Sequence, residues 1–172
     1  ESSAVNAFAA PGGYILITSA LLNELQTEDE LAAVLAHEVA HVIRKHHYRV
    51  MRKQKMLEFG AQAVRVEGAD ELNKLSNMTA QVLARGLDKK SEFEADRDGM
   101  VYAARAGYDA SALYAVLNRL GSRHADKSNE LLNATHPSFS DREQFLIEST
   151  NDALEAAAKP SAAGPRYLST LK

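Results

Sequence analysis

The chain has 172 residues, 45% of them hydrophobic, which is enough for one compact domain with its own core. The net charge of -3 and the lack of a basic and aromatic array give no reason to expect a nucleic-acid partner. The chain has no cysteine, so disulfides and thiolate metal ligands are excluded. It also has no apolar run near the ~20 residues that a membrane-spanning helix needs.

The N-terminal residues predict a small antiparallel sheet. Val5 to Ala9 and Tyr14 to Thr18 have the composition of strands, and Pro11-Gly12-Gly13 between them is typical of a hairpin turn. A short helix is predicted for Ser19 to Leu25. Because the following patterns are helical, we expect an α+β fold that is mostly helical, with its small sheet or hairpin near the N-terminus.

A long helix is predicted after Thr27-Glu28-Asp29-Glu30, which has the pattern of a capping box and is followed by an apolar stripe without Gly or Pro until Gly60. This helix contains the sequence His37-Glu38-Val39-Ala40-His41. Residues four apart share a helix face, so His37 and His41 can bind one metal ion. Glu38 lies beside them, in the position of a general base for a metal-activated water.

A catalytic zinc ion needs a third protein ligand and an open fourth position. His47 is one candidate, but Arg44 stands where comparable three-histidine motifs have a glycine that ends the helix. If the helix continued, His47 would lie roughly 15 Å from His37 along the axis, too far to share one ion. We therefore expect His46 and His47 to be solvated members of the basic run 44–55.

Glu92 is the second candidate for the third ligand. It stands at the predicted start of another helix, where Ser91 can cap and an apolar stripe follows. Asp96 shares the helix face of Glu92 and can accept the free ring N–H of a ligating histidine. Without the upstream histidines this segment would be interpreted as an ordinary acidic helix start. With them, Glu92 is the predicted ligand and Asp96 its outer partner.

The rest of the chain predicts helices and loops around this site. In chain order we expect a loop over 59–68, a helix over 70–85, a helix capped by Asp109 and ended by Gly121, a loop over 122–133 and a last helix capped by Ser140 and Glu143. Residues 1–152 are expected to form the zinc-binding domain. Residues 153–172, which contain Pro and Gly, are expected to be a tail or linker.

Several motifs stand in the order found in one known family. They are Asn6-Ala7-Phe8, Pro11-Gly12-Gly13-Tyr14-Ile15, the histidine motif, Glu92 with Asp96, and His136-Pro137 with Arg142. In this order the chain, over roughly residues 4–147, resembles the zinc metallopeptidases that include HtpX, the CAAX prenyl proteases and BepA. The lack of a membrane span makes it most similar to the BepA-like branch. The resemblance implies a gluzincin endopeptidase fold with one Zn2+ per chain.

The resemblance also implies roles for residues that spacing alone does not assign. Asn6 and His136 would flank the metal and bind substrate or stabilise the oxyanion. In BepA-like members a histidine at the position of His136 can instead bind zinc as a fourth ligand and displace the catalytic water. Arg142 is expected to anchor the loop that holds His136; the alternative is a solvated arginine at a helix start.

These expectations define a zinc-dependent endopeptidase in which Glu38 takes a proton from water and returns it to the leaving amine. The expected substrate is an unfolded or misassembled polypeptide that pairs with the sheet edge. Envelope assembly machinery is the expected partner and the periplasm, or another extracytoplasmic space, the expected location. Because the first residue is Glu1, a preceding signal peptide is also expected. The alternative function is a latent zinc-bound chaperone or adaptor in which His136 closes the site.

Overall fold

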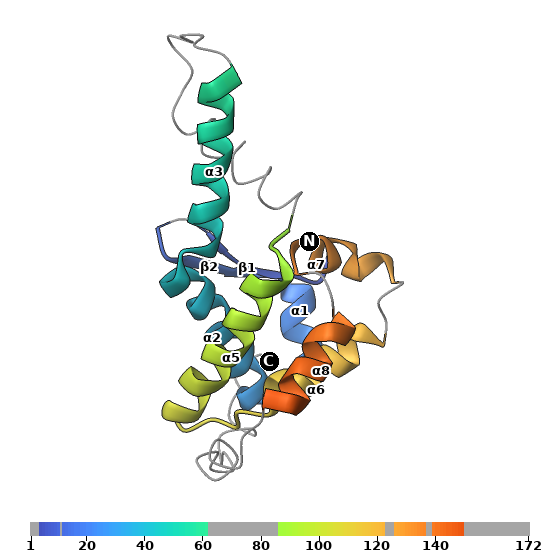
Figure 1. Cartoon of the computed structure of the whole chain (residues 1–172). Coiled ribbons are helices and arrows are strands. Elements are labelled where there is room, and N and C mark those ends of the chain that lie inside the picture. Colours follow the sequence, from blue (N-terminus) through green and yellow to red (C-terminus); the bar gives the residue numbers. More distant parts are fainter. Residues whose placement is uncertain (1–3, 11, 62–85, 123–125, 137–138, 150–172) are drawn as a thin grey trace.

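The computed structural model describes residues 4–10, 12–61, 86–122, 126–136 and 139–149. These residues form seven α-helices, one short 3-10 helix and a two-stranded antiparallel sheet near the N-terminus (Figure 1). The predicted fold class is therefore confirmed. The predicted helix over 70–85, the tail over 153–172 and residues 62–68 of the predicted loop lie outside the described residues.

The sheet is a hairpin of β1 (Ala7–Ala10) and β2 (Tyr14–Ile17), with Ala7 opposite Ile17. Its turn uses Gly12 and Gly13 at φ values of 96° and 89°, which favour glycine. The side chains of β1 alternate between buried and half-buried, and the strand packs on helix α2. Both strands are shorter than predicted. The hairpin therefore lies directly over the helix that carries the histidine motif.

Helix α1 (Ser19–Glu24) follows the sheet, and helix α2 (Glu28–Arg44) carries the histidine motif. Thr27 caps α2, because its hydroxyl accepts the backbone N–H of Glu30 at 3.1 Å. The Glu30 carboxylate accepts the N–H of Gln26 at 2.7 Å, so the predicted capping box is present with its return bond shifted by one residue.

Helix α2 ends at Lys45, which contradicts the prediction of one straight helix. Lys45 has a left-handed backbone with φ of 57°, and helix α3 (His46–Ala61) starts directly after it. A left-handed non-glycine residue costs about 1–2 kcal/mol. Bonds from the Lys45 N–H to the carbonyls of His41 and Val42, and the burial of the next side chain, offset this strain.

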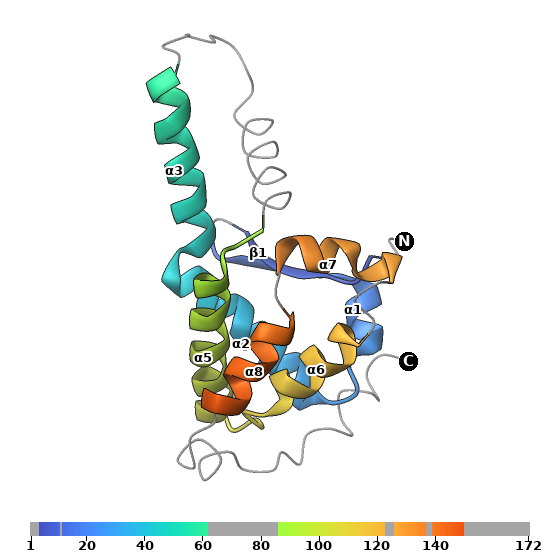
Figure 2. The same ribbon diagram turned by 45° about the vertical axis from the view of Figure 1, so that its right-hand side comes forward.

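The change of direction at Lys45 also corrects the prediction for His46 and His47. Both were expected to be solvated, but His46 is 1% and His47 8% exposed. A straight helix would have carried them away from the histidine motif. Because α3 starts at a new angle, both rings return toward His41, at centroid distances of 5.0 and 5.5 Å. Beyond these residues, α3 projects away from the body of the protein in both views (Figures 1 and 2).

Helix α5 (Lys89–Arg105) lies along α2 and makes the most extensive interhelical contact among the described residues (Figure 2). The predicted cap at Ser91 is wrong. Asp88 caps the helix, because it has the extended backbone of a cap and its carboxylate accepts the N–H of Ser91 at 2.7 Å. The helix therefore begins earlier than predicted, and Glu92 lies within its first turns rather than at its start.

The remaining described elements are α6 (Ala112–Gly121), the 3-10 helix η1 (Lys127–Asn129), α7 (Glu130–Thr135) and α8 (Phe139–Ser149). The prediction of a loop over 122–133 is thus wrong for residues 127–133, and the last helix begins one residue before Ser140. The predicted helix from Asp109 starts at Ala112, although the Asp109 carboxylate does accept the N–H of Ser111 at 2.8 Å.

The core lies between α2, α6 and α8 and includes Leu21, Val34, Met100, Leu113, Leu117, Leu120 and Leu146. No helix in the described part of the chain has the length and apolar character needed to cross a membrane.

One close approach fixes how α5 sits on α2. A Cβ atom on Gly99 would lie 3.0 Å from both the backbone N and the Cα of His37. Because neither backbone atom can move aside alone, we expect Gly99→Ala to lower the free energy of unfolding by about 1–3 kcal/mol. Urea denaturation followed by circular dichroism measures this change.

Gly121→Ala is the matched control, because its Cβ would meet Phe139 at an ordinary 3.5 Å. Alanine is the better helix former, so this variant should be as stable as the parent or slightly more stable. Equal stability of the Gly99→Ala and Gly121→Ala variants would contradict the close approach.

Candidate metal centre

The structure brings together the three predicted ligands from two helices. His37 and His41 lie on successive turns of α2, with their Nε2 atoms 2.9 Å apart. From α5, the Glu92 oxygens lie 3.7 Å from Nε2 of His37 and 3.5 Å from Nε2 of His41. All three side chains are buried, at 4%, 1% and 0% exposure. Their ligand atoms therefore converge on one protected point.

These distances fit a metal ion. Ligands about 2.0–2.1 Å from a tetrahedral zinc lie about 3.3 Å from one another, and the three separations here bracket that value. Oε1 of Glu92 is buried and has no hydrogen-bond partner among the described residues. Such an orphaned carboxylate oxygen needs a cation or another donor. A donor set of two imidazoles and one carboxylate suits zinc.

Burial and neighbouring charges set the protonation states of His41 and Glu92 to those that bind a metal ion. Burial, together with the neighbouring His37 and His136, lowers the pKa of His41 well below its usual value, so the ring is neutral at pH 7. Burial raises the pKa of Glu92, but His136 and Arg142 lower it, and the net pKa is below the usual value. A neutral imidazole and an ionised carboxylate are the forms that bind metals.

Asp96 lies behind His37, where it was predicted. Its Oδ1 is 2.9 Å from Nδ1 of His37, a close polar contact whose alignment falls short of a hydrogen bond. This contact leaves Nε2 of His37 as the nitrogen that faces the other ligands. Burial raises the pKa of Asp96, but the neighbouring Arg142 lowers it by more. The resulting pKa is about 2, so the carboxylate stays charged. Asp96 therefore lies on the outer side of His37, where its orienting partner is expected.

Arg142 of α8 is the counter-charge for these carboxylates. Its Nε and Nη2 donate to the two oxygens of Asp96 at 2.9 and 2.7 Å, and its Nη1 lies 3.0 Å from Glu92 Oε2. At 2% exposure it is not the solvated arginine that was the alternative prediction. Its position ties α8 to the predicted ligand Glu92 and to Asp96 at once.

His46 is a functional candidate that the sequence analysis missed. Its Nε2 lies 3.3 Å from Glu94 Oε2 and its Nδ1 lies 2.8 Å from Nδ1 of His41. If Nε2 donates to the carboxylate, Nδ1 accepts the proton of His41, and Nε2 of His41 keeps its lone pair for the metal. Each predicted ligand histidine thus has a polar neighbour on its outer side. No sequence signal marks this one, because it depends on the turn at Lys45.

Glu38 and His136 lie together beside the ligands. Glu38 is 2% exposed, its Oε1 is 3.5 Å from Nε2 of His136, and its Oε2 has no hydrogen-bond partner among the described residues. An unpaired buried carboxylate oxygen is available to accept a proton. The predicted base therefore lies where it can act near the ligand cluster.

His136 bridges the ligand cluster and the sheet. Its Nδ1 lies 3.1 Å from Glu92 Oε2, and its Nε2 lies 3.0 Å from the carbonyl oxygen of Ala7. Burial lowers the pKa of His136, but Glu92 and Glu38 raise it more, to about 9. Both nitrogens therefore act as donors in this arrangement. The ring also belongs to the group of potential ligands, with His37, His41 and Glu92, whose atoms lie within 4.8 Å of one another.

Asn6 lies directly before β1 and is 1% exposed. Its Oδ1 accepts the hydroxyl of Thr135 at 3.1 Å, which links it to the segment that holds His136. Its Nδ2 is buried without a hydrogen-bond partner among the described residues. The structure therefore places Asn6 against the His136 segment and leaves one buried donor unused.

An active-site helix with two histidines and a glutamate, a carboxylate from a second helix and a sheet edge beside them define the gluzincin class of zinc metallopeptidases. The chain belongs to peptidase family M48, whose family profile matches residues 1–150. The predicted resemblance is therefore confirmed.

Individual relatives agree with this family. The chain is 34% identical to a putative beta-barrel assembly-enhancing protease of Vibrio cholerae, over 80% of this chain and 31% of that protein. It is 32% identical to the mitochondrial metalloendopeptidase OMA1 of Arabidopsis thaliana, over 84% of this chain and 29% of that protein. It is 33% identical to the beta-barrel assembly-enhancing protease of Yersinia pestis, over 95% of this chain and 35% of that protein. The chain thus spans about a third of the length of these relatives.

The contact between His41 and His46 generates a prediction on metal affinity. His46→Ala removes the acceptor that fixes the His41 ring, so we expect zinc affinity to fall about 10–100-fold. Competition with a chromophoric chelator measures this affinity. Lys90→Ala is the control, because it removes only an exposed partner of Glu94, 3.9 Å away. If both variants bound zinc like the parent, His46 would have no orienting role.

Proposed function

We propose that this chain hydrolyses peptide bonds of unfolded or misassembled proteins, using one Zn2+ held by His37, His41 and Glu92. The observation that carries this proposal is the convergence of two histidine nitrogens and an orphaned carboxylate oxygen beside Glu38. Membership of a peptidase family supports it. The sequence His-Glu-x-x-His is the arrangement in which a glutamate serves such a site as base.

Bound at this point, zinc supplies a Lewis acid that acidifies water and polarises a carbonyl group. The protein's own residues then move the protons. Glu38 accepts a proton from the attacking water through its unpaired oxygen and returns it to the leaving amine. His136 donates to Glu92 and to the Ala7 carbonyl, and in this role one N–H leaves its partner and stabilises the negative charge that develops on the substrate's carbonyl oxygen. Asn6, whose buried Nδ2 has no partner among the described residues, assists in binding substrate.

The substrate preference follows from the hairpin beside the metal centre. An extended polypeptide that displaces His136 from the Ala7 carbonyl can add to the edge of β1 that faces away from β2. A folded protein seldom offers a free extended segment, whereas an unfolded or misassembled one does. This site is therefore best suited to polypeptides that have failed to fold or assemble.

The setting is part of the same proposal. Two relatives carry names that refer to enhancement of beta-barrel assembly, and another is named as mitochondrial. Together with the sequence resemblance, the first two favour envelope assembly machinery as the partner and an extracytoplasmic, periplasmic location for this chain. Fractionation of the source cells tests the location.

The alternative function is a latent zinc-bound chaperone or adaptor. One observation favours it, because a nitrogen of His136 lies within ligand range of the same three residues. As a fourth ligand, His136 would fill the position that water needs, and a closed zinc site is structural rather than catalytic. The two functions differ in what the removal of His136 should do.

Glu38→Gln tests the peptidase function directly. The amide cannot accept the proton of water, so we expect cleavage of casein to fall by at least about a hundredfold while the zinc content stays at one per chain. Gel electrophoresis and mass spectrometry follow the products. Comparable cleavage by both proteins would exclude Glu38 as the base, and no cleavage by the zinc-loaded parent would favour the latent function.

His136→Ala distinguishes two roles of His136, that of a hydrogen-bond donor to the oxyanion and that of a fourth zinc ligand that blocks the site. With His136 as a donor, we expect kcat to fall about a hundredfold, since one such donor is typically worth that much. The same casein assay, normalised to bound zinc, measures it. A rise in cleavage would instead show that His136 closes the metal site, and unchanged cleavage would contradict both roles.

A further inference from the structure

Positive charge is concentrated around the start of α3. The whole chain has a net charge of -3, yet residues 44–55 contain six arginines and lysines and no acidic residue. Five of these cations are exposed in the described part of the chain: Arg44, Lys45, Arg49, Arg52 and Lys53. Arg44 pairs with Asp98 of α5 at 2.6 Å, whereas the other four have no ion-pair partner among the described residues. Their charge is therefore not neutralised within this part of the protein.

The exposed cations of α3 share one side of the helix with a tyrosine. At 100° per residue, the positions of Tyr48, Arg49, Arg52 and Lys53 fall within about 140° around the helix axis. Tyr48 is 56% exposed, whereas His47 and Met51, on the opposite side, are buried. Arg49 donates to the Arg44 carbonyl at 2.7 Å, and this neutral acceptor leaves its charge uncompensated. We call this exposed side, together with Lys45 directly before α3, the basic face.

The hairpin turn places a second exposed aromatic ring beside the basic face. Tyr14 is 72% exposed, and a Cβ on Gly12 would lie 3.3 Å from its ring, so the ring lies against the turn. Gly12 lines a cavity of about 310 Å³ together with Lys45 and Tyr48. The two tyrosines and Lys45 therefore lie around the same cavity, between the hairpin turn and the start of α3.

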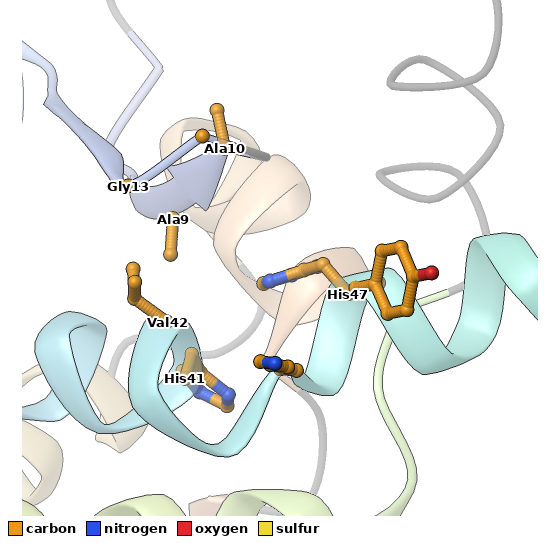
Figure 3. Close-up of a pocket in the computed structure, with 9 residues that line it drawn as sticks. Ala9, Ala10, Gly13, His41, Val42 and His47 are labelled. Carbon is orange, nitrogen blue, oxygen red and sulfur yellow. The ribbon is translucent and has the colours of Figure 1, made fainter.

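This cavity adjoins the metal centre. Its walls include His41, which is a predicted zinc ligand, and also Ala9, Gly13, Val42 and His47 (Figure 3). In both ribbon views α3 projects past the hairpin and away from the body of the protein (Figures 1 and 2). A surface that contacts the basic face along the length of α3 therefore also reaches the hairpin turn and the cavity.

The composition of the basic face fits an anionic lipid bilayer. Uncompensated lysines and arginines are attracted to the phosphates of such a bilayer. Tyrosine is enriched where headgroups meet hydrocarbon, because its ring is apolar and its hydroxyl polar. Protein interfaces, in contrast, have few lysines at their centre and are built around apolar side chains. Because lysine and arginine occupy the middle of this face, charge complementarity favours lipid over a protein partner.

We propose that the basic face and Tyr14 dock this protein on an anionic lipid surface, with α3 lying along that surface and the cavity beside the metal centre next to it. The cations contact lipid phosphates, and the rings of Tyr14 and Tyr48 enter the headgroup layer. This docking goes beyond the proposed peptidase function and does not depend on it, because none of these residues is assigned to the metal or to proton transfer.

Flotation with lipid vesicles tests the docking directly. Zinc-loaded protein is mixed with vesicles of phosphatidylcholine alone, or of phosphatidylcholine with about a third phosphatidylglycerol, and a density gradient separates bound from free protein. We expect the protein to float with the anionic vesicles and not with the neutral ones. Flotation should be lost at ~0.5 M NaCl, because salt screens the attraction.

Removal of two cations tests the basic face. Arg52→Gln combined with Lys53→Gln keeps good helix formers at two exposed positions, and we expect the lipid partition constant to fall about tenfold or more. Arg105→Gln combined with Lys127→Gln is the matched control, because it removes the same charge from exposed positions on α5 and η1. The control should bind within about twofold of the parent.

Removal of a tyrosine tests insertion into the headgroup layer. Tyr14→Thr keeps a residue that suits a strand, and we expect the lipid partition constant to fall severalfold. Ile147→Thr is the control, because it removes a 54% exposed apolar side chain from α8, outside the basic face. Circular dichroism and zinc content verify each variant. Unchanged flotation of the Tyr14→Thr protein would mean that the face attracts polyanions in general, and it would overturn the lipid assignment.

Soluble polyanions distinguish lipid from other partners of a basic surface. Anisotropy measures the binding of labelled polyglutamate and of a labelled single-stranded oligonucleotide. Binding of either one by a protein that does not float with anionic vesicles would overturn the proposal in favour of an acidic polypeptide or a nucleic acid. Equal flotation with neutral and anionic vesicles, or unchanged flotation of the Arg52 and Lys53 variant, would overturn it as well.

The docking and the peptidase function can fail separately. Zinc-loaded Glu38→Gln protein should float like the parent, because Glu38 lies outside the basic face. Flotation by a parent protein that cleaves no casein would support the docking and reject the peptidase function. Casein cleavage that depends on Glu38, by a protein that does not float, would reject the docking alone.

Discussion

The burial of two carboxylates opposite two histidines is the constraint on which the rest of the structure depends. Glu92 and Asp96 are both fully buried, and each would be strongly destabilising without a cation. The guanidinium of Arg142 contacts both carboxylates. Helix α8 therefore supplies the positive charge that keeps these two side chains of α5 ionised where they face α2. The close contact of Gly99 with His37 then sets the spacing at which these charges meet the imidazoles. The metal centre is thus held by three helices, although its predicted ligands come from two.

Local patterns predicted the parts of the site that lie within one element. The spacing of His37 and His41 on a helix, the Thr27 cap and the shared face of Glu92 and Asp96 follow from helical geometry alone. Sequence spacing could not predict the partners of Arg142, because its bonded partner Asp96 lies 46 residues away in the chain. Such contacts depend on how α8 packs, which no local pattern encodes.

The errors of prediction have a common physical cause. Lys45 is not a glycine, so the sequence does not indicate that the helix breaks there. Its left-handed backbone is strained, and the burial of His46 directly after it offsets this strain. The polar segment over 127–135 forms short helices because Leu132 and Thr135 are buried against the rest of the protein. In both places tertiary packing outweighed local propensity. The break at Lys45 mattered most, because it brings His46 to the metal centre.

The bond from His136 to the Ala7 carbonyl also bears on self-association. The open edge of a two-stranded sheet is a template for any extended chain, including the hairpin of another copy of the same protein. His136 occupies one of the outward-facing carbonyls of β1, so a second copy cannot extend a continuous ladder along the whole strand. The N–H of Val5 is bonded to the carbonyl of Ser128 and Ala9 is 3% exposed, so the rest of this edge is also closed to a neighbour. A side chain of the candidate site thereby also discourages edge-to-edge polymerisation.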